Sequence, residues 1–89
     1  MKQSVRAISI LMVLVVAMLC GCKSEEAKKA DHLKKGNAYF EKGEYKSAEL
    51  EFRNAIQIDS NLIEAHARLG EVYLKTGSPE GALREYRIV

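Results

Sequence analysis

The sequence predicts an all-α fold made of a repeated pair of helices, and two observations support this. The first is a period of 34 residues, because a shift by that length places small residues on small ones and aromatic residues on aromatic ones. The second is apolar spacing typical of helical faces in each segment. The matched pairs are His32 and His66, Gly36 and Gly70, Tyr39 and Tyr73, Gly43 and Gly77, Ala48 and Ala82, and Phe52 and Tyr86. A fixed period of this length is the signature of stacked repeats.

The first unit (unit 1, 29–62) begins with a helix expected over 27–42. Leu33, Gly36, Asn37 and Phe40 follow the i, i+3, i+4, i+7 spacing of one helical face. Gly43 should end this helix, because the left-handed conformation at a helix C-terminus favours glycine. A second helix starts at 44–45, with a shared face formed by Tyr45, Ala48, Phe52, Ala55 and Ile56. It ends at 59–61, where Ser60 or Asn61 is predicted to be the N-cap of the next helix.

The second unit (unit 2, 63–89) repeats this order. Its first helix is expected to run to about Lys75, with an apolar set of Leu62, Ala65, Leu69, Val72 and Tyr73. Ser78 suits the N-cap of the following helix and Pro79 its first turn, where the missing N–H costs nothing. That helix continues through Ala82, Leu83 and Tyr86.

Small residues predict how the paired helices pack. Close approach of the two helices of a unit is expected at Gly36, Ala48 and Ala55, and again at Gly70 and Ala82. One unit cannot cover its own apolar face, and about three are needed for a stable stack. With about one and three quarter units present, we expect the chain to be the N-terminal piece of a longer solenoid.

The first residues have the pattern of an export signal. Lys2 and Arg6 precede an apolar run over 7–19, which is the order of a secretory signal peptide. As a permanent helix, 7–22 would be roughly 24 Å long, short of the ~30 Å hydrocarbon core of a membrane. A signal-anchored inner-membrane protein therefore remains the second choice.

Charge and cysteine content exclude several classes of protein. The chain has 14 Lys and Arg residues against 12 Asp and Glu residues, and Lys2 and Arg6 account for the excess. The remainder is balanced, which argues against a nucleic-acid-binding patch and against a disordered acidic tail. The only cysteines are Cys20 and Cys22, so a disulfide framework or a cysteine metal site is not available to the repeats.

The repeat motif resembles a known family. The spacing Gly36-x2-Tyr39-x3-Gly43-x4-Ala48-x3-Phe52-x2-Ala55, followed by Leu69-Gly70-x2-Tyr73-x3-Gly77-x4-Ala82-x3-Tyr86, is similar to tetratricopeptide repeats (TPR). The departures are His32 and His66 for tryptophan, Lys35 for leucine and Ser60 for proline. The resemblance implies an all-α TPR helix-turn-helix solenoid of about one and three quarter repeats after an N-terminal lipoprotein signal helix.

A second resemblance concerns the end of the apolar run. Leu19-Cys20-Gly21-Cys22 resembles a bacterial lipobox, which implies covalent lipid on Cys22 and cleavage after Gly21. Several acyl chains anchor a protein stably, whereas one holds it reversibly. An ordinary signal peptide with an incidental cysteine is the alternative. The absence of Asp after the cysteine, where Lys23 stands, favours the outer over the inner membrane. The expected organisation is a signal peptide (1–21), a polar tether (22–28), TPR 1 (29–62) and a truncated TPR 2 (63–89).

By the TPR resemblance, a protein or peptide partner binds in a concave groove lined by the first helix of each unit. The groove residues are Leu33, Asn37, Phe40, Ala67, Arg68 and Glu71, together with Glu64. Asn37 matches an asparagine of the chaperone-binding carboxylate clamp, but Leu33 replaces the basic residue of the clamp, so that function is excluded. Phe40 has an alternative role, which is to pack against unit 2 only.

No catalytic or metal site is predicted. His32 and His66 are repeat equivalents and do not converge as zinc ligands do, so packing is expected for both. Most of the carboxylates should lie on exposed faces with Lys or Arg three or four residues away, in pairs such as Glu49 with Arg53, Glu64 with Arg68 and Glu80 with Arg84. The carboxylates considered are Glu25, Glu26, Glu49, Glu51, Glu80 and Glu85. No cofactor is expected besides the lipid.

The expected function is a periplasm-facing, membrane-tethered protein-interaction scaffold of the bacterial envelope, in an export or exopolysaccharide-assembly system. The order of lipobox and repeats also resembles TPR lipoproteins of the PEP-CTERM/exosortase system. Pilus-assembly TPR lipoproteins are one alternative. Another is the N-terminal TPR module of a larger envelope enzyme.

Overall fold

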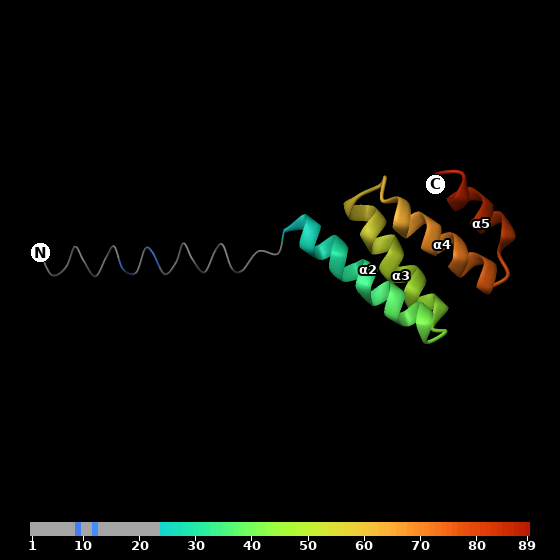
Figure 1. The fold of residues 1–89 in the computed structure, drawn as a ribbon, viewed down its shortest axis with the longest axis horizontal. Coiled ribbons are helices and arrows are strands. Elements are labelled where there is room, and N and C mark those ends of the chain that lie inside the picture. Colours follow the sequence, from blue (N-terminus) through green and yellow to red (C-terminus); the bar gives the residue numbers. More distant parts are fainter. Residues whose placement is uncertain (1–8, 10–11, 13–23) are drawn as a thin grey trace, which may run out of the picture.

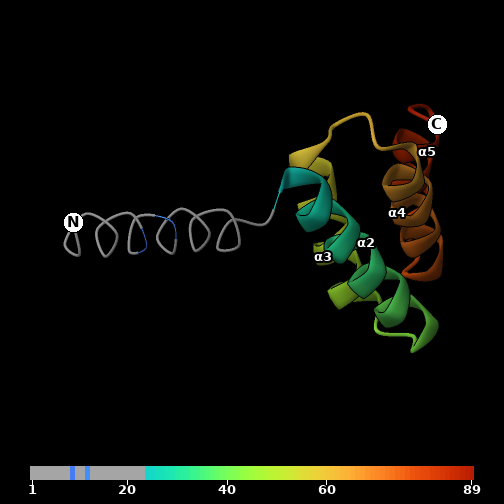
Figure 2. The same cartoon turned by 60° about the vertical axis from the view of Figure 1, so that its left-hand side comes forward.

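A computed structural model describes Ser9, Met12 and residues 24–89. Residues 24–89 form four helices: α2 (Glu25–Glu41), α3 (Tyr45–Ile58), α4 (Ile63–Lys75) and α5 (Pro79–Tyr86). Each unit is a helical hairpin, and Figures 1 and 2 both show the α2–α3 pair beside the α4–α5 pair. α3 contacts both α2 and α4, and α2 also contacts α4. Among the described residues there is no strand, and the fold is the helical TPR solenoid that the repeat predicts.

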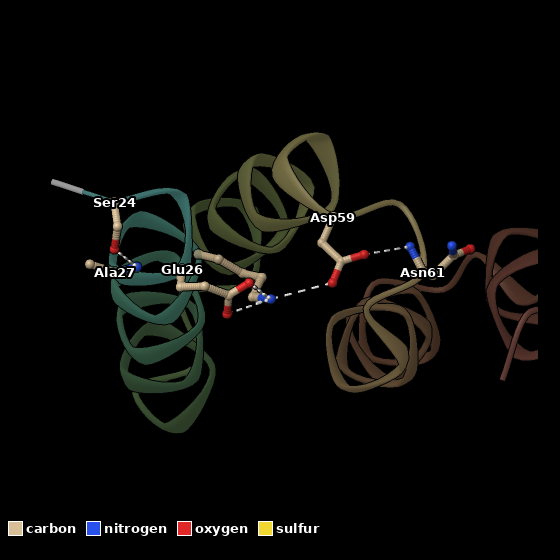
Figure 3. Close-up of polar contacts among 6 residues, drawn as sticks. Ser24, Glu26, Ala27, Asp59 and Asn61 are labelled. Carbon is tan, nitrogen blue, oxygen red and sulfur yellow. Dashed lines mark hydrogen bonds and ion pairs between the residues drawn. The ribbon is translucent and has the colours of Figure 1, made fainter. Parts of the chain in front are cut away.

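The signal peptide, the lipobox and Cys22 lie outside the described residues. In the described part of the expected tether, 25–28 already belongs to α2, which begins two residues before the expected start of the helix at 27. Ser24 explains the early start, since its Oγ accepts a hydrogen bond from the Ala27 N–H at 3.2 Å (Figure 3). Glu25 and Glu26 then place negative charge at the positive end of the helix dipole. In the part of the chain that the structure covers, no helix is both long and apolar enough to cross a membrane.

Both first helices end at the predicted glycines. Gly43 and Gly77 have φ angles of 75° and 77°, in the left-handed region. This conformation turns the next N–H back to the helix, so Glu44 donates to the Tyr39 carbonyl at 2.9 Å and Ser78 donates to the Tyr73 carbonyl at 2.7 Å. The two turns are therefore the same structure repeated, as the sequence period predicts.

The predicted N-cap between the units is wrong. α4 begins at Ile63 and its N-cap is Leu62, not Ser60 or Asn61, and no side chain caps it. Asp59 is the reason, because its Oδ1 accepts a hydrogen bond from the Asn61 N–H at 3.1 Å and forms a turn before the helix (Figure 3). The other Asp59 oxygen lies 3.3 Å from Lys29 Nζ, which ties this turn to α2.

The core runs through both units along α3 and α4. Its buried members are Ala48, Phe52, Ala55, Ala65, Leu69, Val72, Tyr73 and Ala82. The predicted close approach of the helices is confirmed at both glycines. A Cβ atom on Gly36 would lie 2.6 Å from the Phe52 ring, and one on Gly70 would lie 2.5 Å from the Tyr86 ring. Each aromatic ring thus fills the space that its glycine leaves.

Candidate functional site

Three of the seven predicted groove residues lie on α2. Leu33, Asn37 and Phe40 are all half-buried, and Leu33 and Phe40 pack against the core. The Phe40 ring meets the Tyr45 ring edge to face, with centroids 5.5 Å apart and planes at 70°. Edge-to-face geometry is favourable for aromatic pairs, so Tyr45 fixes the position of the ring.

The other four groove residues lie on α4, and Arg68 connects them to α2. They are Glu64, Ala67, Arg68 and Glu71. The carbon at the centre of the Arg68 guanidinium lies 5.6 Å from the centroid of the Phe40 ring, within cation–π range. Its Nη1 lies 3.1 Å from Glu71 Oε2. The sequence predicted a pair with Glu64 instead, but the structure pairs Arg68 with Glu71, one turn later. Phe40 therefore packs against unit 2 through Arg68.

The Asn37 side chain contains an unsatisfied acceptor beneath this surface. Its Oδ1 is buried and has no hydrogen-bond partner within the described part of the chain. A buried acceptor without a donor costs free energy, about 1–3 kcal/mol in measured cases.

His66 forms a buried polar pair that the sequence analysis missed. Its Nδ1 lies 2.6 Å from Glu85 Oε2 on α5, and its Nε2 lies 2.8 Å from the Ser60 carbonyl oxygen. A carbonyl can only accept, so Nε2–H must donate to it, and the bond to Glu85 then needs a second proton. Burial on its own would lower the pKa of His66, but the hydrogen bonds to Glu85 and Ser60 and the Glu85 charge together raise it.

Unit 1 contains the equivalent pair in a more open setting. His32 Nδ1 lies 2.7 Å from Glu51 Oε2, and both side chains are partly exposed. Glu85 is an exception to the exposed positions expected for most carboxylates, because it is buried against His66. The signal was present in the sequence, since each histidine is followed 19 residues later by a glutamate. In the described range, no three metal-ligating side chains come together.

A hollow of about 390 Å³ opens elsewhere on the repeats, between α3 and α5 and above α4. Its lining residues are Arg53, Ile56, Gln57, His66, Leu69, Tyr73, Arg84 and Glu85. None of the seven groove residues lines it. At its rim Arg53 Nη2 donates to the Tyr73 hydroxyl at 2.5 Å and lies 2.8 Å from Glu49 Oε1, which confirms the predicted Glu49–Arg53 pair. This network connects α3 of unit 1 to α4 of unit 2.

Comparison with known proteins supports a TPR protein. Residues 36–77 match the family model described as TPR repeat. The matched segment covers the end of α2, all of α3 and α4, and both left-handed glycines. No curated protein and no solved structure matches the chain. TPR repeats generally bind protein or peptide partners, which makes protein–protein interaction the function class of these helices.

Proposed function

We propose that the chain is a lipid-anchored TPR scaffold that binds a peptide segment of a partner protein along α2 and α4. The observation that carries the proposal is the half-buried row of Leu33, Asn37 and Phe40 on α2, which Arg68 of α4 adjoins through the Phe40 ring. The Asn37 side chain supports recognition of a peptide backbone, because an amide can pair with main-chain N–H and C=O groups whatever the side chains are.

The rest of the groove suggests the chemistry of the partner. Leu33 and Phe40 offer apolar contact, and the Arg68–Glu71 pair at the other side is partly exposed. An extended or helical peptide with one apolar anchor and flanking polar side chains fits this mixture, and such anchors give most of the affinity in peptide recognition. A partner of this kind needs no cofactor.

The tether is proposed from the lipobox-like sequence. Lipid on Cys22 would hold the repeats at the periplasmic side of a bacterial membrane, with the outer membrane favoured. The short distance from Cys22 to Glu25, where α2 begins, would keep the groove close to the membrane surface. Such a scaffold suits an export or exopolysaccharide-assembly machine, or an equivalent machine for pilus assembly.

The groove is tested with the purified full chain and a displayed library of random peptides as the probe. Peptides selected on the native chain should bind the Asn37→Ala variant about tenfold more weakly, because one hydrogen bond is worth about 1 kcal/mol or slightly more. Lys34→Ala, an exposed change on the same helix, is the matched control and should bind normally. Equal binding by all three proteins would exclude the groove, provided that their helical circular dichroism agrees.

The tether is tested separately in a bacterial host with an alkyne analogue of palmitate. The native chain should be labelled and should pellet with membranes, and Cys22→Ser should lose both properties. Cys20→Ser is the control and should keep the label. Labelling that persists in Cys22→Ser would overturn the lipid anchor without affecting the groove.

A further inference from the structure

A second surface of the repeats has the features of a ligand site, and none of the groove residues belongs to it. It is the hollow of about 390 Å³ between α3 and α5, here called the α3–α5 hollow. Its volume is in the range of small-molecule sites, which combine an apolar wall with a few polar groups. Ile56 and Leu69 provide the apolar part of the lining, whereas Arg53, Gln57 and Arg84 provide the polar part. This combination fits a ligand that has both an apolar body and a polar group.

The two arginines of the α3–α5 hollow have N–H groups available for a ligand. Arg53 contacts the Tyr73 hydroxyl and Glu49 Oε1 with the same nitrogen, Nη2, whereas a guanidinium carries N–H donors on all three of its nitrogens. Arg84 is exposed on α5. Within the described part of the chain no ion pair involves Arg84, so the pair with Glu80 that the sequence predicts is absent. Both arginines can therefore donate to an anion in the hollow.

The carboxylates near the α3–α5 hollow are already bound to other groups. Glu85 lines the hollow, but its Oε2 lies 2.6 Å from Nδ1 of His66, and the second proton of the imidazole balances the carboxylate charge. Glu49 at the rim offsets the charge of Arg53 at 2.8 Å. Arg84 thus remains as a positive charge without a counterion among the lining residues of the hollow. A ligand with one negative charge fits this balance.

We propose that the α3–α5 hollow binds a small organic carboxylate with an apolar body. The carboxylate accepts hydrogen bonds from Arg84 and Arg53, because the planar guanidinium presents parallel N–H groups that match the two oxygens of a carboxylate. The apolar body contacts Ile56 and Leu69 on the wall of the hollow. The hollow is separate from the groove of α2 and α4, so this inference does not depend on the proposed function.

Phenylacetate is the probe, because it joins one carboxylate to one apolar ring. Its binding to the full chain is followed by the shifts of backbone amide signals in nuclear magnetic resonance spectra. The titration is made at about pH 6, where His66 is protonated and a carboxylic acid of this kind is ionised. We expect saturable binding in the roughly millimolar range, since the ligand has few atoms. Uncharged phenylacetamide has the same shape and should bind at least about fivefold more weakly, because it lacks the charge-assisted hydrogen bonds.

Three variants assign the binding to the α3–α5 hollow. Arg84→Gln should weaken the binding of phenylacetate at least about fivefold. Arg87→Gln is the matched control, because it removes the same charge from the end of α5 outside the hollow, and it should bind as the native chain does. Gln57→Glu adds a negative charge to the exposed part of the lining and should also weaken binding.

Two kinds of result would overturn the proposal. One is phenylacetate binding that Arg84→Gln leaves unchanged, or that Arg87→Gln weakens by the same factor as Arg84→Gln. The other concerns the probe, since phenylacetamide binding as tightly as phenylacetate would exclude recognition of the carboxylate. Inorganic phosphate that binds more tightly than phenylacetate would likewise exclude a contribution of the apolar wall.

Discussion

The two units contain the same contact between a glycine and an aromatic ring, but the two rings have different surroundings. The hypothetical Cβ distance to the ring is 2.6 Å at Gly36 and 2.5 Å at Gly70, so the fit within each unit is equal. Phe52 is nevertheless fully buried, whereas Tyr86 keeps 39% of its surface exposed. The difference arises because α4 covers Phe52 and no described helix covers Tyr86. The contacts within a unit follow from the sequence of that unit, whereas the burial of its aromatic ring depends on the helices of the next unit.

The histidine–glutamate pairs differ in the same direction but for another reason. The His32 side chain is 28% exposed and its partner Glu51 16%, against 6% for His66 and 11% for Glu85. His66 also has a second partner, the Ser60 carbonyl, which belongs to the turn between the units. Nε2–H donates to that carbonyl, so a neutral imidazole has no N–H left on Nδ1 to donate to Glu85. The Ser60 carbonyl is therefore the reason that the pair of His66 and Glu85 needs a second proton. The described contacts of His32 include no such carbonyl.

The largest expected difference between the units concerns the two rings. Phe52→Ala should lower the free energy of unfolding by about 3–5 kcal/mol, the usual cost of removing a fully buried aromatic ring. Tyr86→Ala should cost less than half of that, because its ring is already partly in water. Urea unfolding of the full chain, followed by circular dichroism, measures both. Similar losses for the two variants would show that Tyr86 is covered in solution.

The stability lost on replacing each glycine by alanine should differ between the units by a smaller amount. Gly36→Ala should destabilise the chain by about 1–3 kcal/mol, because the new methyl group overlaps the Phe52 ring, which is enclosed on every side. Gly70→Ala should cost less, because the Tyr86 ring can move toward solvent and alanine favours the helix by up to about 1 kcal/mol. The same unfolding measurements decide the point. A Gly70→Ala loss as large as that of Gly36→Ala would contradict this account.

Those features that repeat with the period could be predicted from the sequence. The helix ends at Gly43 and Gly77 and the packing of Gly36 on Phe52 depend only on local conformation and residue size. The start of α4 could not be predicted in the same way. The turn in which Asp59 accepts a hydrogen bond from the Asn61 N–H is an alternative to a helix N-cap at Ser60 or Asn61. Several side chains in that segment can form either a turn or a helix N-cap, and the repeat period does not indicate which of the two forms.

The candidate site was less predictable because polar pairing depends on three-dimensional neighbours. Arg68 could reach Glu64 or Glu71 along α4, and the Phe40 ring on α2 favours the rotamer that faces Glu71. Glu85 looked like a surface residue by its spacing on α5, and only the position of His66 on α4 shows why it is buried. The groove residues themselves remain a prediction that the peptide experiment tests.

The smallest effect is a difference in pH dependence between the two histidines. The pKa of His66 is raised in the folded chain, so its contribution to stability is complete below the ordinary value of 6.5 and is lost as the pH rises through the folded pKa. Glu85, which bonds directly to His66, favours the protonated form, and Arg53 on α3 and Arg84 on α5 line the same hollow. The native chain should therefore become less stable as the pH is raised from about 6.

Replacing each histidine by glutamine separates the two pairs. In His66→Gln the decline above pH 6 should flatten, because glutamine has no proton to lose, and in His32→Gln it should persist, because the buried pair is unchanged. Denaturant midpoints measured from pH 5.5 to 8.5 on the full chain give the three profiles. If the decline followed His32 and not His66, the Ser60 carbonyl would not be what distinguishes the units. If it persisted in both variants, another group would carry the pH dependence.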